Sequence, residues 1–122
     1  MVQKIARVFG VALLVVGILG FVPAAVTDGK LFGIFPVNTF HNVVHILLGL
    51  WGLAGSGSFA GAVAYLRAQA MIYGLLAVLG LIPATDTLFG LVPLHGADVA
   101  LHAVLAAIAA WAGWGLAKQQ PA

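Results

Sequence analysis

Four long apolar runs constrain the fold of this sequence more than any other feature. They cover residues 8–26, 40–55, 66–84 and 97–117, and their only charged residues, Arg67 and Asp98, each stand second in a run. Each run is near the ~20 residues that cross a hydrocarbon core of ~30 Å, the second being the shortest. Because lipid offers the backbone no hydrogen bonds, such spans must be helical. The sequence therefore predicts an all-α integral membrane protein with one domain over residues 1–122.

The composition supports a membrane protein and excludes several other classes. Hydrophobic residues make up 63% of the chain and charged residues only 7%, against roughly a quarter in ordinary soluble domains. The net charge of +2 reflects a scarcity of acids, not a basic cluster, so no nucleic-acid partner is expected. Cysteine is absent, which excludes disulfides and thiolate-bound metals.

The chain also contains an internal repeat. The segment LFGIFPVNTFHNVVH (31–45) matches LFGLVPLHGADVALH (88–102) at a constant offset of 57 residues. Upstream, Arg7, Gly20 and Pro23 match Arg67, Gly80 and Pro83 at an offset of 60. We therefore expect a four-helix bundle made of two tandem two-helix repeats, at about 4–60 and 61–118. The first apolar run is then the counterpart of the third, which favours a retained span over a cleaved signal peptide.

The distribution of charge predicts the orientation of the four spans. Four of the five cationic residues fall on one predicted side of the membrane, and they are Lys4, Arg7, Arg67 and Lys118. By the positive-inside tendency this face is cytoplasmic, so both termini are expected in the cytoplasm, with the chain in the inner membrane. Arg67 is expected at the start of the third span, at the level of the cytoplasmic headgroups. The opposite face holds Lys30, the three aspartates and all four histidines.

Histidines and one aspartate open the second and fourth runs at helical spacing. His41 and His45 are four residues apart, as are Asp98 and His102, so each pair lies on one face of its helix. The repeat makes His41 equivalent to Asp98 and His45 equivalent to His102. If the second and fourth spans face each other, all four side chains converge about one turn inside the outer membrane edge.

Three interpretations of this His/Asp cluster remain open. Polar side chains in a bundle can simply hydrogen-bond neighbouring helices together. Neutral imidazoles with one carboxylate also suit a transition metal such as Zn²⁺, Cu²⁺, Ni²⁺ or Fe²⁺, with His41, His45, Asp98 and His102 as ligands. Finally, His45 and His102 could be the axial ligands of haem b.

The sequence gives no evidence for an enzyme. The two serines, Ser56 and Ser58, fall on the face opposite the histidines, which excludes a Ser–His pair. Phosphate-binding loops and dinucleotide fingerprints are absent from the sequence. We expect a non-enzymatic protein of the lipid bilayer that binds a metal or haem. The alternative is a structural or accessory subunit of a homo-oligomer or larger membrane complex, in which the cluster only holds neighbouring helices together by hydrogen bonds.

The two repeated motifs resemble one known family. GIFPVNTFHNVVHILLGLWGLAG followed by GLVPLHGADVALHAVLA is similar to the bacterial four-span membrane family named domain of unknown function 4383, over nearly the whole chain. The resemblance implies the four-span fold, and it implies no activity. It places the family's motif positions at Asn38, His41, Asn42, His45, Asp98 and His102. His95 stands where the family pattern leads us to expect Asn, so we do not expect it in a shared site.

Overall fold

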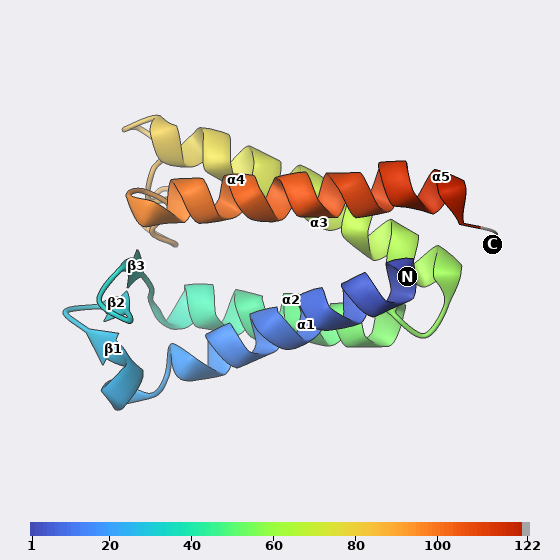
Figure 1. Cartoon of the computed structure of the whole chain (residues 1–122). Coiled ribbons are helices and arrows are strands. Elements are labelled where there is room, and N and C mark those ends of the chain that lie inside the picture. Colours follow the sequence, from blue (N-terminus) through green and yellow to red (C-terminus); the bar gives the residue numbers. More distant parts are fainter. Residues whose placement is uncertain (121–122) are drawn as a thin grey trace.

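The computed structural model describes residues 1–120, and these are mostly helical (Figure 1). The helices are α1 (Val2–Leu19), α2 (Thr39–Gly55), α3 (Phe59–Leu81) and α4 (Ala97–Ala110). The last continues through a π-helical segment, η2 (Trp111–Leu116), into α5 (Ala117–Gln119). In the packing, α1 lies mainly against α2 and α3 against α4, so the molecule consists of two helical hairpins. The predominantly helical fold with four main helices is as predicted.

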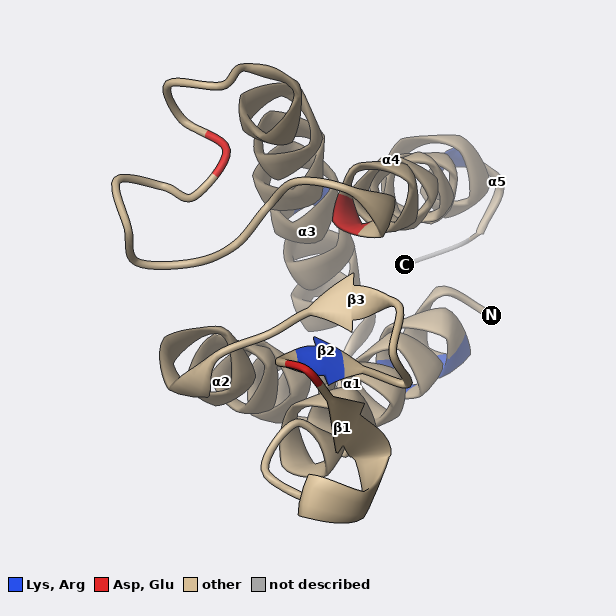
Figure 2. Cartoon of the chain, turned by 90° about the vertical axis from the view of Figure 1, so that its left-hand side faces the viewer, with Lys and Arg blue, Asp and Glu red and all other residues tan. Residues whose placement is uncertain are grey.

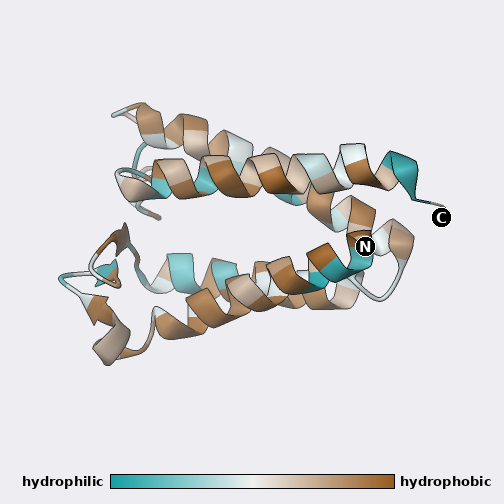
Figure 3. Cartoon of the chain, in the orientation of Figure 1, coloured by the Kyte–Doolittle hydropathy of each residue, from teal (hydrophilic) through white to brown (hydrophobic). Residues whose placement is uncertain are grey.

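Three of the helical segments are long and apolar enough to cross a membrane. They are α1, α3 and the continuous run Ala97–Gln119. Apolar residues run along the length of these helices (Figure 3). Helix α2 has 17 residues, which at 1.5 Å per residue gives about 25 Å, somewhat less than a bilayer core.

Two predicted helix boundaries are wrong. Helix α3 begins at Phe59 and not near residue 66, because the Ser58 hydroxyl caps it by accepting a hydrogen bond from the Gly61 amide at 3.0 Å. The small residues that follow had resembled a flexible connector, yet a capped start lets them be helical. Arg67 consequently lies well inside α3. The first helix ends at Leu19, before Pro23 and a short 3₁₀ turn, η1 (Pro23–Ala25), instead of extending to residue 26.

The connection between α1 and α2 contains a small sheet that the sequence did not predict. Strands β1 (Val26–Thr27), β2 (Lys30–Leu31) and β3 (Phe35–Pro36) pair antiparallel in the order β1–β2–β3. In the register Val26 faces Leu31, and Leu31 faces Phe35. Two-residue strands are too short to show an alternating pattern, so the sequence gives no warning of them.

The second connection, residues 82–96, has no strand but shares backbone geometry with the first. The Val37 amide donates to the Gly29 carbonyl at 3.0 Å, and 57 residues later the Leu94 amide donates to Asp86 at 2.7 Å. Another such pair is Phe32 and Phe89, which both adopt the left-handed region, with φ of 56° and 57°. Both connections lie at the same end of the molecule, and the start of α1, the end of α5 and the α2–α3 turn lie at the other (Figure 1).

Within the first hairpin, glycines allow the two helix backbones to approach closely. A Cβ atom on Gly10 would lie 2.8 Å from the Gly49 carbonyl oxygen, and one on Gly49 would lie 2.7 Å from that of Gly10. Such contacts between small residues are typical of helices that pack in membranes. The main buried core lies between α1, α3 and the α4–η2 helix, where its large side chains are Phe9, Leu13, Tyr65, Leu66 and Tyr73.

Charged residues divide between the two ends of the molecule. Viewed from the end with the long connections, acidic residues appear in both connections and at the start of α4 (Figure 2). The same end carries Lys30, in β2, whereas the other lysines and the arginines lie on the helices farther from the viewer. The acids and most of the cations are therefore separated along the axis of the bundle.

Candidate metal centre

The start of α2 positions two of the three clustered histidines. The Asn38 side chain caps the helix by accepting a hydrogen bond from the His41 amide at 2.8 Å, as the sequence predicts for this residue. Its amide nitrogen donates to the Leu91 carbonyl in the second connection at 2.9 Å. Asn38 thus fixes the first turn of α2 and ties it to the other repeat.

His41 and His45 contact each other one turn apart on α2. Their Nε2 atoms are 3.0 Å apart and their ring centroids 4.2 Å apart. One ring nitrogen must donate and the other accept, because two neutral imidazoles can share only one proton along this contact. The pair is buried, so its polar atoms face the interior and not solvent.

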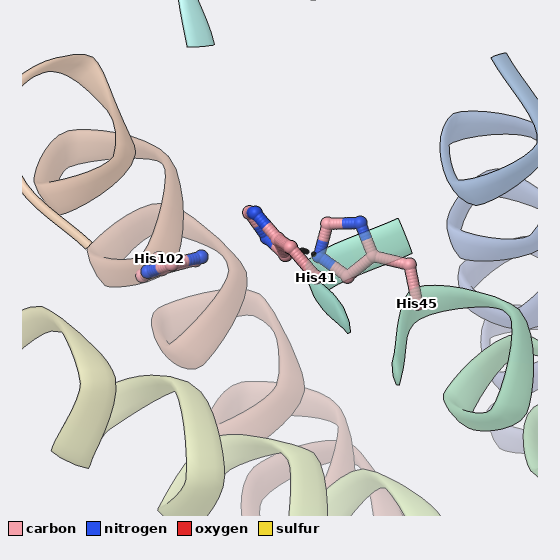
Figure 4. A group of neighbouring side chains, drawn as sticks. All are labelled: His41, His45 and His102. Atoms are coloured by element: carbon pink, nitrogen blue, oxygen red, sulfur yellow. Dashed lines mark hydrogen bonds between the residues drawn. The ribbon is translucent and has the colours of Figure 1, made fainter. Parts of the chain in front are cut away.

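His102 approaches this pair from α4. Its ring centroid lies 6.4 Å from that of His41, and one ligand nitrogen from each of the three histidines falls within 4.8 Å of the others. His41 stands between the other two rings (Figure 4). The three histidines thus converge from α2 and α4 near the end of the molecule that carries the two connections, as we expected for helices that face each other. We call His41, His45 and His102 the histidine cluster.

Asp98 lies close to the histidine cluster but is not a member of that group in the described chain. The side chain is only 1% exposed and faces a cavity of about 140 Å³, also lined by His41 and His45, beneath the first connection. We call this space the outer cavity. His95, the fourth histidine, is exposed in the second connection, in agreement with the expectation that it stays outside the site.

A second cavity lies on the other side of the histidine cluster. It has a volume of about 230 Å³, and we call it the lateral cavity because it lies between α2 and α3. His41, His45, His102 and Tyr73 line its inner wall, whereas the remaining walls are apolar. His41 and His45 therefore separate two cavities.

Several polar atoms at this site are buried without a hydrogen-bond partner among the described residues. They are the Nδ1 atoms of the three clustered histidines, one carboxylate oxygen of Asp98 and the hydroxyl of Tyr73. A buried polar group without a partner costs about 1–3 kcal/mol, and native proteins contain few of them. Their concentration at one place indicates a site that binds a polar species.

Tyr73 is a site residue that the sequence analysis missed. Its ring centroid is 5.2 Å from that of His102, and its side chain is 1% exposed. The available signal was a polar stripe in an apolar helix, because Tyr65, Gln69 and Tyr73 follow one another at intervals of four residues. Such spacing places all three on one face of α3.

Comparison with known proteins identifies the family of the chain. The model of one family, Domain of unknown function (DUF4383), matches residues 3–115. The chain belongs to the DUF4383 family. This DUF4383 protein matches none of the curated proteins and none of the solved structures with which it was compared. Both connections and the whole histidine cluster lie within the matched residues, and the family description assigns them no activity.

Proposed function

We propose that this DUF4383 protein is a four-span membrane protein whose histidine cluster binds a divalent transition metal ion. The observation that carries the proposal is the approach of three buried imidazoles, from α2 and α4, to within 4.8 Å of one another. Neutral imidazole is a good ligand for Zn²⁺, Cu²⁺ and Fe²⁺. Ligand nitrogens at 2.0–2.1 Å around a tetrahedral zinc lie about 3.3 Å apart, so small side-chain rotations would close the site.

Asp98 lies beside this site and is not one of its three proposed ligands. Asp98 falls outside the three-histidine group but lines the outer cavity together with His41 and His45. We therefore propose that it binds a water molecule on the ion and not the ion itself. Carboxylates that bind a metal's ligands or waters, and not the metal, commonly hold those groups in place.

Haem b fits the arrangement less well than a metal ion. Two axial histidines must stand on opposite faces of a porphyrin, with the macrocycle between their rings. Here the His41 ring occupies the space between His45 and His102, at 4.2 Å and 6.4 Å from them. We therefore favour a metal ion over haem.

The four-span topology is part of the proposal. It requires α2 to cross despite its 17 residues, with local thinning of the bilayer, which costs fractions of a kcal/mol per Å. The matching backbone hydrogen bonds and left-handed phenylalanines of the two connections support two tandem repeats. The separation of charges supports termini in the cytoplasm, and we place the protein in a bacterial inner membrane.

A structural role is the second candidate, and one contact favours it. The 3.0 Å bond between His41 and His45 satisfies both Nε2 atoms without any ion. Both residues belong to α2, so under this alternative the hairpins are joined by the Asn38–Leu91 hydrogen bond and by packing of His102 against His41. The protein is then an accessory subunit of a homo-oligomer or larger membrane complex.

Metal analysis of protein purified in detergent without a histidine tag separates the two candidates. We expect one Zn²⁺, Cu²⁺ or Fe²⁺ per chain, and at least 100-fold weaker binding in His45→Ala and His102→Ala, because each substitution removes one of three ligands. His95→Ala is the matched control, since His95 is exposed in the second connection, and it should bind as the wild type does. Folded wild-type protein that binds none of the three added ions would establish the structural alternative instead.

A further inference from the structure

The two cavities beside the histidine cluster differ in their polar side chains, because Tyr73 and His102 line only the lateral cavity and Asp98 lines only the outer cavity. The lateral cavity is walled by apolar side chains of α2, α3 and the second connection, among them Val44, Leu76 and Leu88. Phe40 at its rim is exposed, and Ile72 and Leu76 are half-buried, so the cavity opens at the outer surface of the bundle. On a chain that spans a membrane, this surface faces lipid.

The size and lining of the lateral cavity suit one segment of an acyl chain. Its volume of about 230 Å³ is below the ~300–1,000 Å³ of pockets that enclose a drug-sized ligand. A lipid could therefore place part of one chain inside while the remainder stays in the bilayer. The bond next to that chain would then lie against the histidines and Tyr73 on the inner wall.

Most of the wall of the outer cavity is also apolar, but its three polar side chains, His41, His45 and Asp98, can hold water. Its volume of about 140 Å³ exceeds the ~30 Å³ that a water molecule occupies in the liquid. Three of the residues that line it have a buried polar atom without a hydrogen-bond partner among the described residues, namely a carboxylate oxygen of Asp98 and the Nδ1 atoms of His41 and His45, and a buried water needs two to four partners. Water and an acyl chain would thus reach the histidine cluster from different sides.

We propose that this protein is a metal-dependent hydrolase of acyl lipids, cleaving an ester or amide bond of a fatty acyl chain. The proposal rests on the metal site proposed above. A zinc ion held by three histidines keeps a fourth position for water, which is the arrangement of catalytic zinc sites, and it makes that water a nucleophile near neutral pH. Asp98 lies on the water side of the cluster and Tyr73 on the lipid side.

Each group then has one task in the reaction. Asp98 takes a proton from the water, whose oxygen bonds to the carbonyl carbon of the lipid, and the π electrons move onto the carbonyl oxygen. The Tyr73 hydroxyl donates a hydrogen bond to that oxygen as its negative charge develops. The carbonyl re-forms as the C–O or C–N bond breaks, and the leaving alcohol or amine takes the proton from Asp98. Water and lipid are consumed, a fatty acid and an alcohol or amine are formed, and no redox partner is needed.

Hydrolysis of 4-nitrophenyl octanoate by the full chain, loaded with one Zn²⁺ in detergent, tests the proposal. Asp98→Asn should lower kcat at least 100-fold, the usual range for a lost general base, with the zinc content unchanged. Tyr73→Phe should lower kcat about 100- to 1,000-fold through the lost hydrogen bond. Asp86→Asn and Tyr65→Phe are the matched controls and should retain wild-type rates, because neither side chain lines either cavity.

A second pair of variants tests the acyl chain's place. Leu76→Trp fills the lateral cavity and should lower the octanoate rate at least 10-fold while leaving the rate with 4-nitrophenyl acetate within 2-fold. The control, Leu75→Trp, adds the same ring to the exposed neighbour outside the cavity and should change neither rate.

The two proposals fail in different ways. Zinc-loaded protein that hydrolyses the octanoate ester no faster than zinc-free protein would overturn the hydrolase, while the metal site would stand. A wild-type rate in Asp98→Asn would likewise overturn it, since the activity would then come from elsewhere. A chain that binds no zinc at all would remove the metal site and the hydrolase together.

Discussion

At the scale of single residues, glycine determines how closely the first hairpin packs. A Cβ atom on Gly49 would meet backbone atoms of α1, 2.7 Å from both the Gly10 oxygen and the Leu14 nitrogen, and backbone cannot move aside cheaply. By contrast, a Cβ on Gly74 of α3 would lie 3.9 Å from its nearest neighbour, the Ala106 side chain. The two positions therefore separate close packing from helix propensity.

We expect Gly49→Ala to lower the free energy of unfolding by about 1–2 kcal/mol. Overpacking costs about 1–3 kcal/mol, and the gain in helix propensity of up to about 1 kcal/mol offsets part of it. Gly74→Ala should instead raise stability slightly, because only propensity changes there. Unfolding titrations with sodium dodecyl sulfate in mixed micelles measure both values. If both variants were equally stabilised, the close approach of α1 and α2 would be wrong.

The residues of the site differ in how far the sequence could predict them. His41 with His45, and Asp98 with His102, follow from helical spacing. The repeat made the two pairs equivalent, but their convergence still depended on the second and fourth helices facing each other. The exclusion of Asp98 from the three-histidine group was not predictable, because it depends on side-chain direction across two helices. Tyr73 was missed because a tyrosine in an apolar helix usually signifies membrane depth or core packing, and only its contact with His102 assigns it to the site.

At the scale of elements, the last helix contains an irregularity that Arg67 contacts. The segment η2 is π-helical, a form that is rare and usually limited to one turn. The Arg67 Nε atom donates a hydrogen bond to the Gly113 carbonyl in this segment at 2.8 Å, and its guanidinium lies 5.5 Å from the centre of the Trp114 ring. Since propensity does not distinguish π from α geometry, the sequence predicted a regular helix here and placed Arg67 among the headgroups.

Substitution of Arg67 tests whether this contact stabilises η2. We expect Arg67→Met to lower the unfolding free energy by about 1.5–3 kcal/mol, the usual value of a hydrogen bond from a charged group. Arg67→Lys should restore little, because a lysine lacks the planar guanidinium that both bonds and stacks. Its repeat counterpart Arg7 is exposed on α1, so Arg7→Met should change stability by less than about 0.5 kcal/mol. Wild-type stability in Arg67→Lys would mean that charge alone matters at this position.

At the scale of the whole molecule, the sequence predicted the four main helices better than the parts that join them. Apolar runs and a repeated turn motif are enough to predict four helices in a short chain. The connections were harder, because the sheet of β1, β2 and β3 depends on left-handed residues such as Asp28 and Phe32 and not on any hydrophobic pattern. Helix ends also depend on single caps such as Ser58, which moved the start of α3 by several residues.

Whether α2 crosses the membrane decides where the histidine cluster lies, and cysteine labelling can test it. The natural sequence has no cysteine, so single variants Thr27→Cys, Gly57→Cys and Ala84→Cys report the two connections and the α2–α3 turn without background. With four spans and cytoplasmic termini, a membrane-impermeant maleimide added to bacterial spheroplasts should label Thr27→Cys and Ala84→Cys but not Gly57→Cys. If α2 did not cross, Gly57→Cys would be labelled with Thr27→Cys, and Ala84→Cys would be protected. That result would put the two connections on opposite sides of the membrane, which is incompatible with their position at one end of the molecule and with the bond between Asn38 and Leu91.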